Sequence, residues 1–199
     1  DGFLLTVGDD IVNQSAKQRP QDRAQDDTSI VGKIIFINLL NGEHEIFSKG
    51  HRNPQGLFVE DDLILSTEHG PNGGDEINKI IFGENYGWPV SSYGETYNWG
   101  KTKENKKELD FKKDHKSLGF KEPIFSYVPS IGISEIVKIP DDFSILWKNN
   151  FLISSLYGYS LHRVKFNDSY EKIIFNEKIF VGDRIRDLKF IENHNILLL

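Results

Sequence analysis

Apolar and polar residues alternate along most of the chain in short runs, and no long window repeats apolar residues at the i, i+3, i+4 and i+7 positions of an amphipathic helix. Turn-forming triplets such as Asn-Gly-Glu at 41–43 and Asn-Asp-Ser at 167–169 separate the runs, as they do between antiparallel strands. The pattern predicts an all-β fold. The expected strands cover residues 3–7, 33–38, 45–47, 57–60, 63–67, 76–82, 133–139, 151–154, 161–166, 172–175, 185–191 and 196–199.

One order of parts recurs within this pattern. Residues 32–67 and 159–199 each begin with a strand, a polar turn and a short strand, followed by an arginine-bearing loop. Each copy then continues with two further strands that are separated by an acidic turn. A four-stranded unit of about 40 to 50 residues is the repeat of a β-propeller blade; a β-sandwich with coincidental hairpins is the alternative. Residues 1–10 match the last part of the unit and residues 195–199 end on a strand, so we expect an internal segment cut at both ends.

Composition narrows the classes of partner. The 199 residues carry a formal charge of −6 without a basic stripe, which argues against nucleic acid as the main partner. No apolar run approaches the ~18 residues of a membrane span, and the absence of cysteine excludes disulfides and thiolate metal sites. The common nucleotide-binding, zinc-protease and serine-hydrolase motifs are absent. Two polar stretches, 13–27 and 98–121, are expected to be solvated loops.

The stretch Ser-Thr-Glu-His-Gly-Pro-Asn-Gly-Gly-Asp-Glu-Ile-Asn at 66–78 has more glycine and proline than a chain reversal requires. Its glycines would let main-chain carbonyls approach a cation, and Ca²⁺ takes about six to eight oxygen ligands. Asp75 and Glu76 are neighbours in an expected strand, so they should point to opposite faces and serve two different sites. His69 alone is weak support for a base or a metal ligand.

Two arginines, Arg52 and Arg184, occupy equivalent places in the two copies of the repeat. Arg186 lies on the same side of an extended segment as Arg184. Guanidinium groups bind planar carboxylates or phosphates in a bidentate manner, so a shared position near the channel mouth predicts an anionic ligand. The alternative is that each arginine pairs with a nearby acid, such as Asp183 or Asp187.

Five ordered motifs carry a resemblance to a known family: Gly-His-Arg-Asn-Pro-Gln-Gly-Leu at 50–57, Glu-His-Gly-Pro-Asn-Gly-Gly-Asp-Glu-Ile-Asn at 68–78, Gly-Glu-Asn-Tyr-Gly-Trp-Pro at 83–89, Tyr-Val-Pro-Ser-Ile-Gly-Ile-Ser at 127–134 and Arg-Ile-Arg-Asp-Leu-Lys-Phe at 184–190. The chain resembles the soluble quinoprotein sugar dehydrogenases of the glucose/sorbosone dehydrogenase family, in its aldose sugar dehydrogenase branch. The resemblance covers nearly the whole chain and is weakest over 98–121. It implies a six-bladed β-propeller, of which residues 1–199 form one partial domain.

The same resemblance implies an activity and its cofactors. Family members oxidise an aldose at C1 to the lactone with pyrroloquinoline quinone (PQQ) and Ca²⁺. The residues implied to contact or buttress the cofactor are Arg52, Asn53, Gln55, His69, Asp75, Tyr97, Tyr127, Arg184 and Arg186. The residues implied to bind Ca²⁺ are Gly70 and Pro71, through their carbonyls, and Glu76 and Tyr86 at a further structural ion. The family's catalytic base is a histidine expected upstream of residue 1, so this chain by itself is expected to be an open, inactive part of the ring with no catalytic residue of its own.

Two other functions stay open at this point. A non-catalytic propeller could keep the family frame as a binding module, and a Ca²⁺-dependent lactonase is disfavoured because hydrolysis would not explain the clustered arginines. The resemblance also implies a periplasmic or secreted location and an aldose substrate. It leaves open the sugar preference, the electron acceptor and the oligomeric state, a homodimer included.

Overall fold

The computed structural model describes residues 1–9, 20–95, 111–191 and 195–198, and the all-β prediction is confirmed. Its strands are β1 (Gly2–Val7), β2 (Lys33–Asn38), β3 (His44–Lys49), β4 (Pro54–Glu60), β5 (Leu63–Glu68), β6 (Asp75–Lys79), β7 (Phe125–Tyr127), β8 (Ile133–Lys138), β9 (Phe151–Ser155), β10 (Ser160–Phe166), β11 (Ile173–Phe180), β12 (Leu188–Ile191) and β13 (Asn195–Leu198). Three short 3-10 helices occur in the described residues: η1 (Pro20–Gln25), η2 (Lys116–Leu118) and η3 (Ile145–Trp147).

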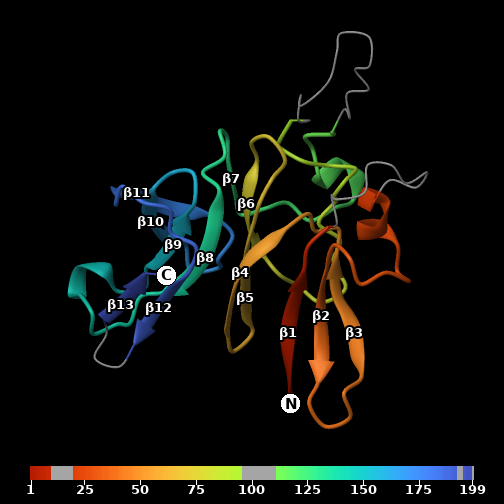
Figure 1. The fold of residues 1–199 in the computed structure, drawn as a ribbon, viewed down its shortest axis with the longest axis horizontal. Helices are drawn as coiled ribbons and strands as arrows, with labels where there is room; N and C mark the ends of the chain where they lie inside the picture. Colours follow the sequence, from red (N-terminus) through yellow and green to blue (C-terminus); the bar gives the residue numbers. More distant parts are fainter. Residues whose placement is uncertain (10–19, 96–110, 192–194, 199) are drawn as a thin grey trace.

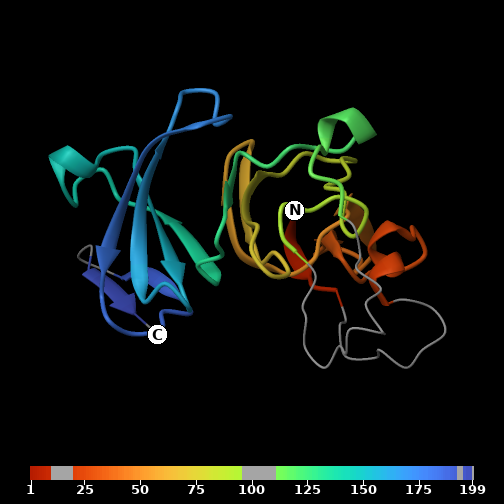
Figure 2. The same ribbon diagram turned by 90° about the horizontal axis from the view of Figure 1, so that it is seen from above.

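The strands form separate antiparallel sheets in which chain neighbours pair. The orders are β1-β2-β3, β4-β5-β6-β7, β8-β9-β10-β11 and β12-β13. Figures 1 and 2 show the sheets standing side by side. Strand β8 packs against β4 and β5 of the preceding sheet, and β12 packs against β8 in turn. Antiparallel meander sheets packed one after another in chain order are the arrangement of propeller blades. The predicted unit differs from a blade in its limits, because residues 32–67 supply β2 and β3 of one sheet and β4 and β5 of the next.

Main-chain register gives β5 and β6 two unlike faces. Leu65 and Ile77 enter an apolar cluster between the β4–β7 and β8–β11 sheets, together with Ile136 and Phe151. On the opposite face, Glu68 pairs with Glu76 and Ser66 with Asn78 across the two strands. All four of these polar side chains are buried. Since burying polar groups is costly unless they find partners, this face must be covered by complementary groups.

Every expected strand is present, with shifted ends. Strand β6 stops at Lys79 rather than at residue 82, and β11 runs to Phe180 rather than 175. Strand β7 was not predicted, because three residues are too few to show alternation. Parts of the two polar stretches form η1 and η2.

Candidate ligand and cation site

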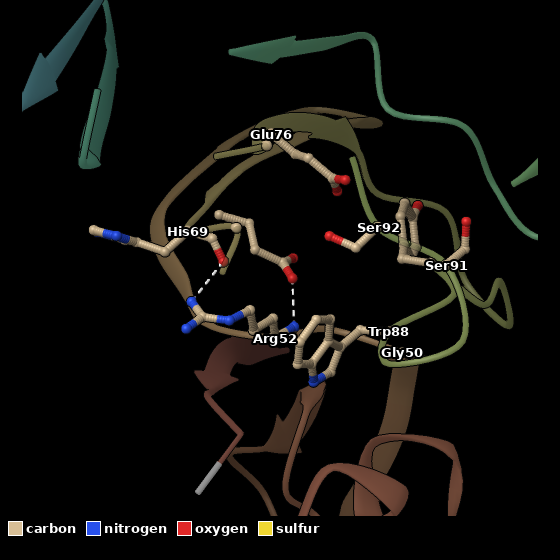
Figure 3. A pocket seen from close by; sticks show the side chains of 11 residues that line it. Gly50, Arg52, His69, Glu76, Trp88, Ser91 and Ser92 are labelled. Carbon is tan, nitrogen blue, oxygen red and sulfur yellow. Dashed lines mark hydrogen bonds between the residues drawn. The ribbon is translucent and has the colours of Figure 1, made fainter. Parts of the chain in front are cut away.

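A small cavity lies between the polar face of β5–β6 and the segment 86–92. Its volume is about 10 Å³, which is the space of a single water-sized occupant. The lining residues are Gly50, Arg52, Glu68, His69, Gly70, Gly74, Glu76, Tyr86, Trp88, Ser91 and Ser92. Figure 3 shows Glu76 and Ser92 pointing toward one another across this space. The cavity therefore joins residues from both motifs that suggested a site.

Arg52 is buried at the edge of the cavity, with 6% of its surface exposed. One terminal nitrogen of its guanidinium donates to the carbonyl of His69 at 3.0 Å, and the guanidinium carbon lies 5.6 Å from the ring centre of Trp88 (Figure 3). Its main-chain N–H donates to Glu68 Oε1, and its carbonyl accepts from the N–H of Asp9. These contacts fix both the main chain and the side chain of Arg52.

Glu68 belongs to a buried hydrogen-bond network with His51 and Ser48. Its Oε2 lies 2.9 Å from Nδ1 of His51, whose Nε2 lies 2.9 Å from the hydroxyl of Ser48. The imidazole uses both ring nitrogens in this network, one toward the carboxylate and one toward the hydroxyl. A serine, a histidine and an acid also form hydrolase triads, but Ser48 is 1% exposed and does not line the cavity. The network is structural.

Glu76 is the second carboxylate of the cavity. Burial raises the pKa of Glu76 well above its usual range, and the charge of nearby Glu68 raises it further. Its Oε2 accepts from Nδ2 of Asn78 at 3.2 Å, and its Oε1 lies 3.9 Å from Nε2 of His115. Among the described residues, Oδ1 of Asn78 is buried without a hydrogen-bond partner. Buried oxygens with too few donors favour a cation or a water in this region.

The chemistry of the lining fits Ca²⁺ in part. Two carboxylates and two serine hydroxyls are hard oxygen ligands, the type that Ca²⁺ prefers. No group of three or more acidic or histidine side chains in the described ranges could hold a metal ion. Carbonyl oxygens would therefore have to complete a coordination shell. The hydroxyl of Tyr86 donates to the carbonyl of Lys79 at 2.6 Å and accepts from the N–H of Ile81, so this hydroxyl is already committed.

Asp75 points away from Glu76, as strand alternation requires. Its Oδ1 accepts from the N–H of Gly70 at 3.1 Å and from the hydroxyl of Ser130 at 2.8 Å. Its Oδ2 accepts from the N–H groups of Ile131 and Ile133, both at 3.0 Å. One buried carboxylate thus ties the 70–75 loop to the start of β8.

The glycines of this loop are explained by close packing. A Cβ at Gly70 would overlap the carbonyls of Gly73 and Gly74. Gly74 has a φ of +71°, and a Cβ there would overlap the main chain of Gly94. The loop therefore needs glycine both for positive φ and for close approach of the main chain.

Two of the three predicted arginines act on the same histidine. Burial lowers the pKa of half-buried His69; the charges of Arg52 and Arg186 lower it further, while the charge of Asp75 opposes the shift. Arg184 and Arg186 are both exposed. In the part of the chain that the structure describes, no ion pair joins either guanidinium to Asp183 or Asp187, whose carboxylates accept main-chain N–H groups instead.

The other predicted residues lie apart from the cavity. Half-buried Asn53 and Gln55 hydrogen-bond to each other at 3.0 Å. Pro71 is buried next to the cavity but does not line it. Tyr127 does not face the cavity: it lies in the apolar cluster between the sheets, with its hydroxyl accepting from Asn176 at 3.3 Å. Tyr97 lies outside the described residues.

Sequence reasoning did not identify Glu68, Trp88 or the two serines as part of the site. Glu68 carried the clearest signal, because an acid at the end of an apolar strand pairs across the hairpin with Glu76. Trp88 stood within a quoted motif but had no chemistry of its own to mark it. The serines Ser91 and Ser92 reach the cavity only through the loop that follows the cis Trp88–Pro89 peptide.

Comparisons with known proteins agree with this architecture. A family model described as glucose/sorbosone dehydrogenase matches residues 1–199. The chain is 31% identical over 189 residues to aldose sugar dehydrogenase YliI of Escherichia coli K12, and the alignment covers 86% of this chain and 48% of that protein. It is 38% identical over 115 residues to quinoprotein glucose dehydrogenase B of Acinetobacter calcoaceticus, which covers 46% of this chain and 24% of that protein.

A solved structure gives the same result for the fold. The apo form of the soluble aldose sugar dehydrogenase of Escherichia coli superposes with a TM-score of 0.77 at 25% identity, over 98% of this chain and 56% of that one. The chain spans about half the length of the curated relatives it matches. In the described residues, the structure contains no helix of the length and apolarity that a membrane crossing needs.

Proposed function

The chain belongs to the glucose/sorbosone dehydrogenase family, and from this membership we propose that the full-length protein is a quinoprotein oxidoreductase that oxidises aldoses at C1 to lactones with PQQ and Ca²⁺. In this proposal residues 1–199 are part of a six-bladed propeller domain, and the protein acts in the periplasm or outside the cell. The electron acceptor is a separate partner.

The observation that carries the proposal is the position of Arg52. A buried guanidinium, fixed by His69 and Trp88 beside an oxygen-lined cavity, offers a planar donor for a carboxylate. The charge of Arg186 lowers the pKa of the same histidine, so a second guanidinium lies within electrostatic reach of this region. A flat anion with several carboxylates, such as PQQ, matches two such groups.

The chain's own residues hold and orient in this proposal. Arg52, Arg184 and Arg186 would bind the carboxylates of PQQ, with Asn53, Gln55, His69 and Tyr97 as further contacts and Asp75 as the buttress of the loop. Tyr127 is left out of this set because it packs in the core between the sheets. The carbonyls of Gly70 and Pro71 would hold one Ca²⁺. Glu76, Glu68 and the main-chain carbonyl of Tyr86 would hold another, because the Tyr86 hydroxyl is already hydrogen-bonded. When bound, PQQ supplies a quinone that accepts hydride and Ca²⁺ supplies a Lewis acid. No residue of this chain is assigned the proton transfer.

Reconstitution of the full-length protein tests the proposal. The apo-protein is mixed with PQQ and Ca²⁺, and the reduction of a redox dye is followed with a panel of aldoses. The expected result is aldose-dependent reduction that requires PQQ and Ca²⁺ and falls strongly in Arg52→Ala. Folded protein that binds Ca²⁺ but reduces no dye with any aldose would favour the non-catalytic binding module.

A further inference from the structure

Glu68 is shared between the two halves of the site. One oxygen of its carboxylate accepts the main-chain N–H of Arg52, and the other accepts from His51. The same carboxylate lines the cavity with Glu76. A single buried side chain therefore contacts the anion-binding arginine and faces the candidate cation position.

The contacts of Glu68 link its position to those of its neighbours. His51 is held from its other ring nitrogen by Ser48 and stacks on the ring of Tyr86, with ring centres 4.6 Å apart. Tyr86 in turn lines the cavity. Because the contact to Arg52 runs through its main chain, a displacement of Glu68 shifts the origin of the guanidinium side chain.

The two carboxylates repel each other while no positive charge lies between them. This repulsion is one cause of the raised pKa of Glu76, after burial. A divalent cation in the cavity would attract both carboxylates and hold Glu68 in one position. This coupling is reciprocal: if the bound cation increases the affinity of Arg52 for an anionic ligand, the bound ligand increases the affinity of the cavity for the cation by the same factor.

We propose that Glu68 is a positioning residue that couples binding of a divalent cation in the cavity to the placement of Arg52, so that the cation and an anionic ligand on Arg52 bind cooperatively. This inference rests on the proposed function for the identity of the cation as Ca²⁺ and of the anion as PQQ.

The first test uses Ca²⁺ alone, without PQQ. Hydrogen–deuterium exchange of peptides containing the Arg52 amide is measured in the full-length protein with and without Ca²⁺. Saturating Ca²⁺ is expected to slow exchange at this amide about tenfold, within the range of typical coupling energies. Equal exchange in both conditions would overturn the inference, and so would the absence of Ca²⁺ binding in calorimetry.

Three variants assign the effect. Glu68→Gln keeps an acceptor for the Arg52 amide, and His51 can change tautomer to accept from the new amide group, so the fold should persist while the response to Ca²⁺ falls below about twofold. Glu76→Gln leaves the Arg52 contact untouched and should also lose the response. Glu60→Gln changes an exposed glutamate of the same sheet, paired with Lys138, and should respond like the wild type. A wild-type response in Glu68→Gln would refute the role of Glu68.

PQQ titrations separate this inference from the proposed function. In the wild type, Ca²⁺ should tighten PQQ binding, and Glu68→Gln should remove about tenfold of that tightening while any direct contact between the two ligands survives. Failure of PQQ to bind, with Ca²⁺-dependent protection of Arg52 intact, would reject the quinoprotein assignment and support the coupling. Identical tightening in wild type and Glu68→Gln would reject the coupling alone.

Discussion

Replacing Asp75 with asparagine should destabilise the protein by about 2–4 kcal/mol. The carboxylate accepts four hydrogen bonds, two on each oxygen, and is 1% exposed. An asparagine amide nitrogen facing Ile131 and Ile133 would oppose two N–H donors. Turned the other way, it would oppose the N–H of Gly70, whereas the hydroxyl of Ser130 can rotate and accept.

The less costly orientation therefore leaves one buried N–H unpaired. That group costs about 1–3 kcal/mol, and the two remaining main-chain bonds weaken together by about 1 kcal/mol when their acceptor loses its charge. The sum is a large part of the stability of a typical domain.

Urea denaturation of the full-length protein, followed by circular dichroism at constant Ca²⁺, measures this loss. Asp183→Asn is the matched control: Asp183 is exposed and accepts one main-chain N–H from Arg184, so the change should stay within about 0.5 kcal/mol. A loss below about 1 kcal/mol for Asp75→Asn, with an unchanged denaturant slope, would refute the account of this carboxylate.

Three further predictions follow from the site. The folded-state pKa of Glu76 lies above its unfolded value, so the neutral form of Glu76 favours folding at low pH, and this contribution disappears as the pH rises. In Ca²⁺-free buffer, urea denaturation should therefore show that the wild type loses more stability between about pH 5 and about pH 8 than Glu76→Gln does. Equal losses in the two proteins would contradict the raised pKa. Gly74→Ala should lower the free energy of unfolding by more than the ~1–2 kcal/mol expected from backbone strain alone. The matched control is Gly42→Ala, because Gly42 has a similar positive φ with open space around it. Equal losses in the two variants would mean that the main chain of Gly94 can move aside. Arg52→Lys should weaken PQQ binding about 10- to 100-fold in a fluorescence titration, because it loses a charge-assisted planar contact. Arg163→Lys on β10 is the control and should leave the affinity for PQQ unchanged. An unchanged affinity in Arg52→Lys would remove this arginine from the ligand site.

Local alternation predicted the strands and the class of fold, because side chains of period two report directly which residues face a sheet neighbour. It also predicted that the side chains of Asp75 and Glu76 point to opposite faces of the strand, and in the structure they have separate hydrogen-bond partners. The repeat predicted that Arg52 and Arg184 are equivalent, and each of them precedes the first strand of a sheet, β4 and β12 respectively.

Features that depend on contacts between distant segments were not predictable in this way. Tyr127 looks like a site aromatic in its motif, but the register of β6 with β7 turns it into the core between two sheets. Glu68 became part of the site only because residues 86–92 fold back over the polar face of β5–β6. No single window of the sequence contains that juxtaposition.

The two unlike faces of β5 and β6 have a consequence for how this region can change. The apolar face packs the β4–β7 sheet against the β8–β11 sheet, while the polar face meets Ser91 and Ser92, which belong to none of the apolar clusters of the described residues. Substitutions at these two serines can therefore change the polar lining of the cavity without disturbing the packing of the β4–β7 sheet against the β8–β11 sheet, so the lining and this joint can vary independently on opposite sides of the same two strands.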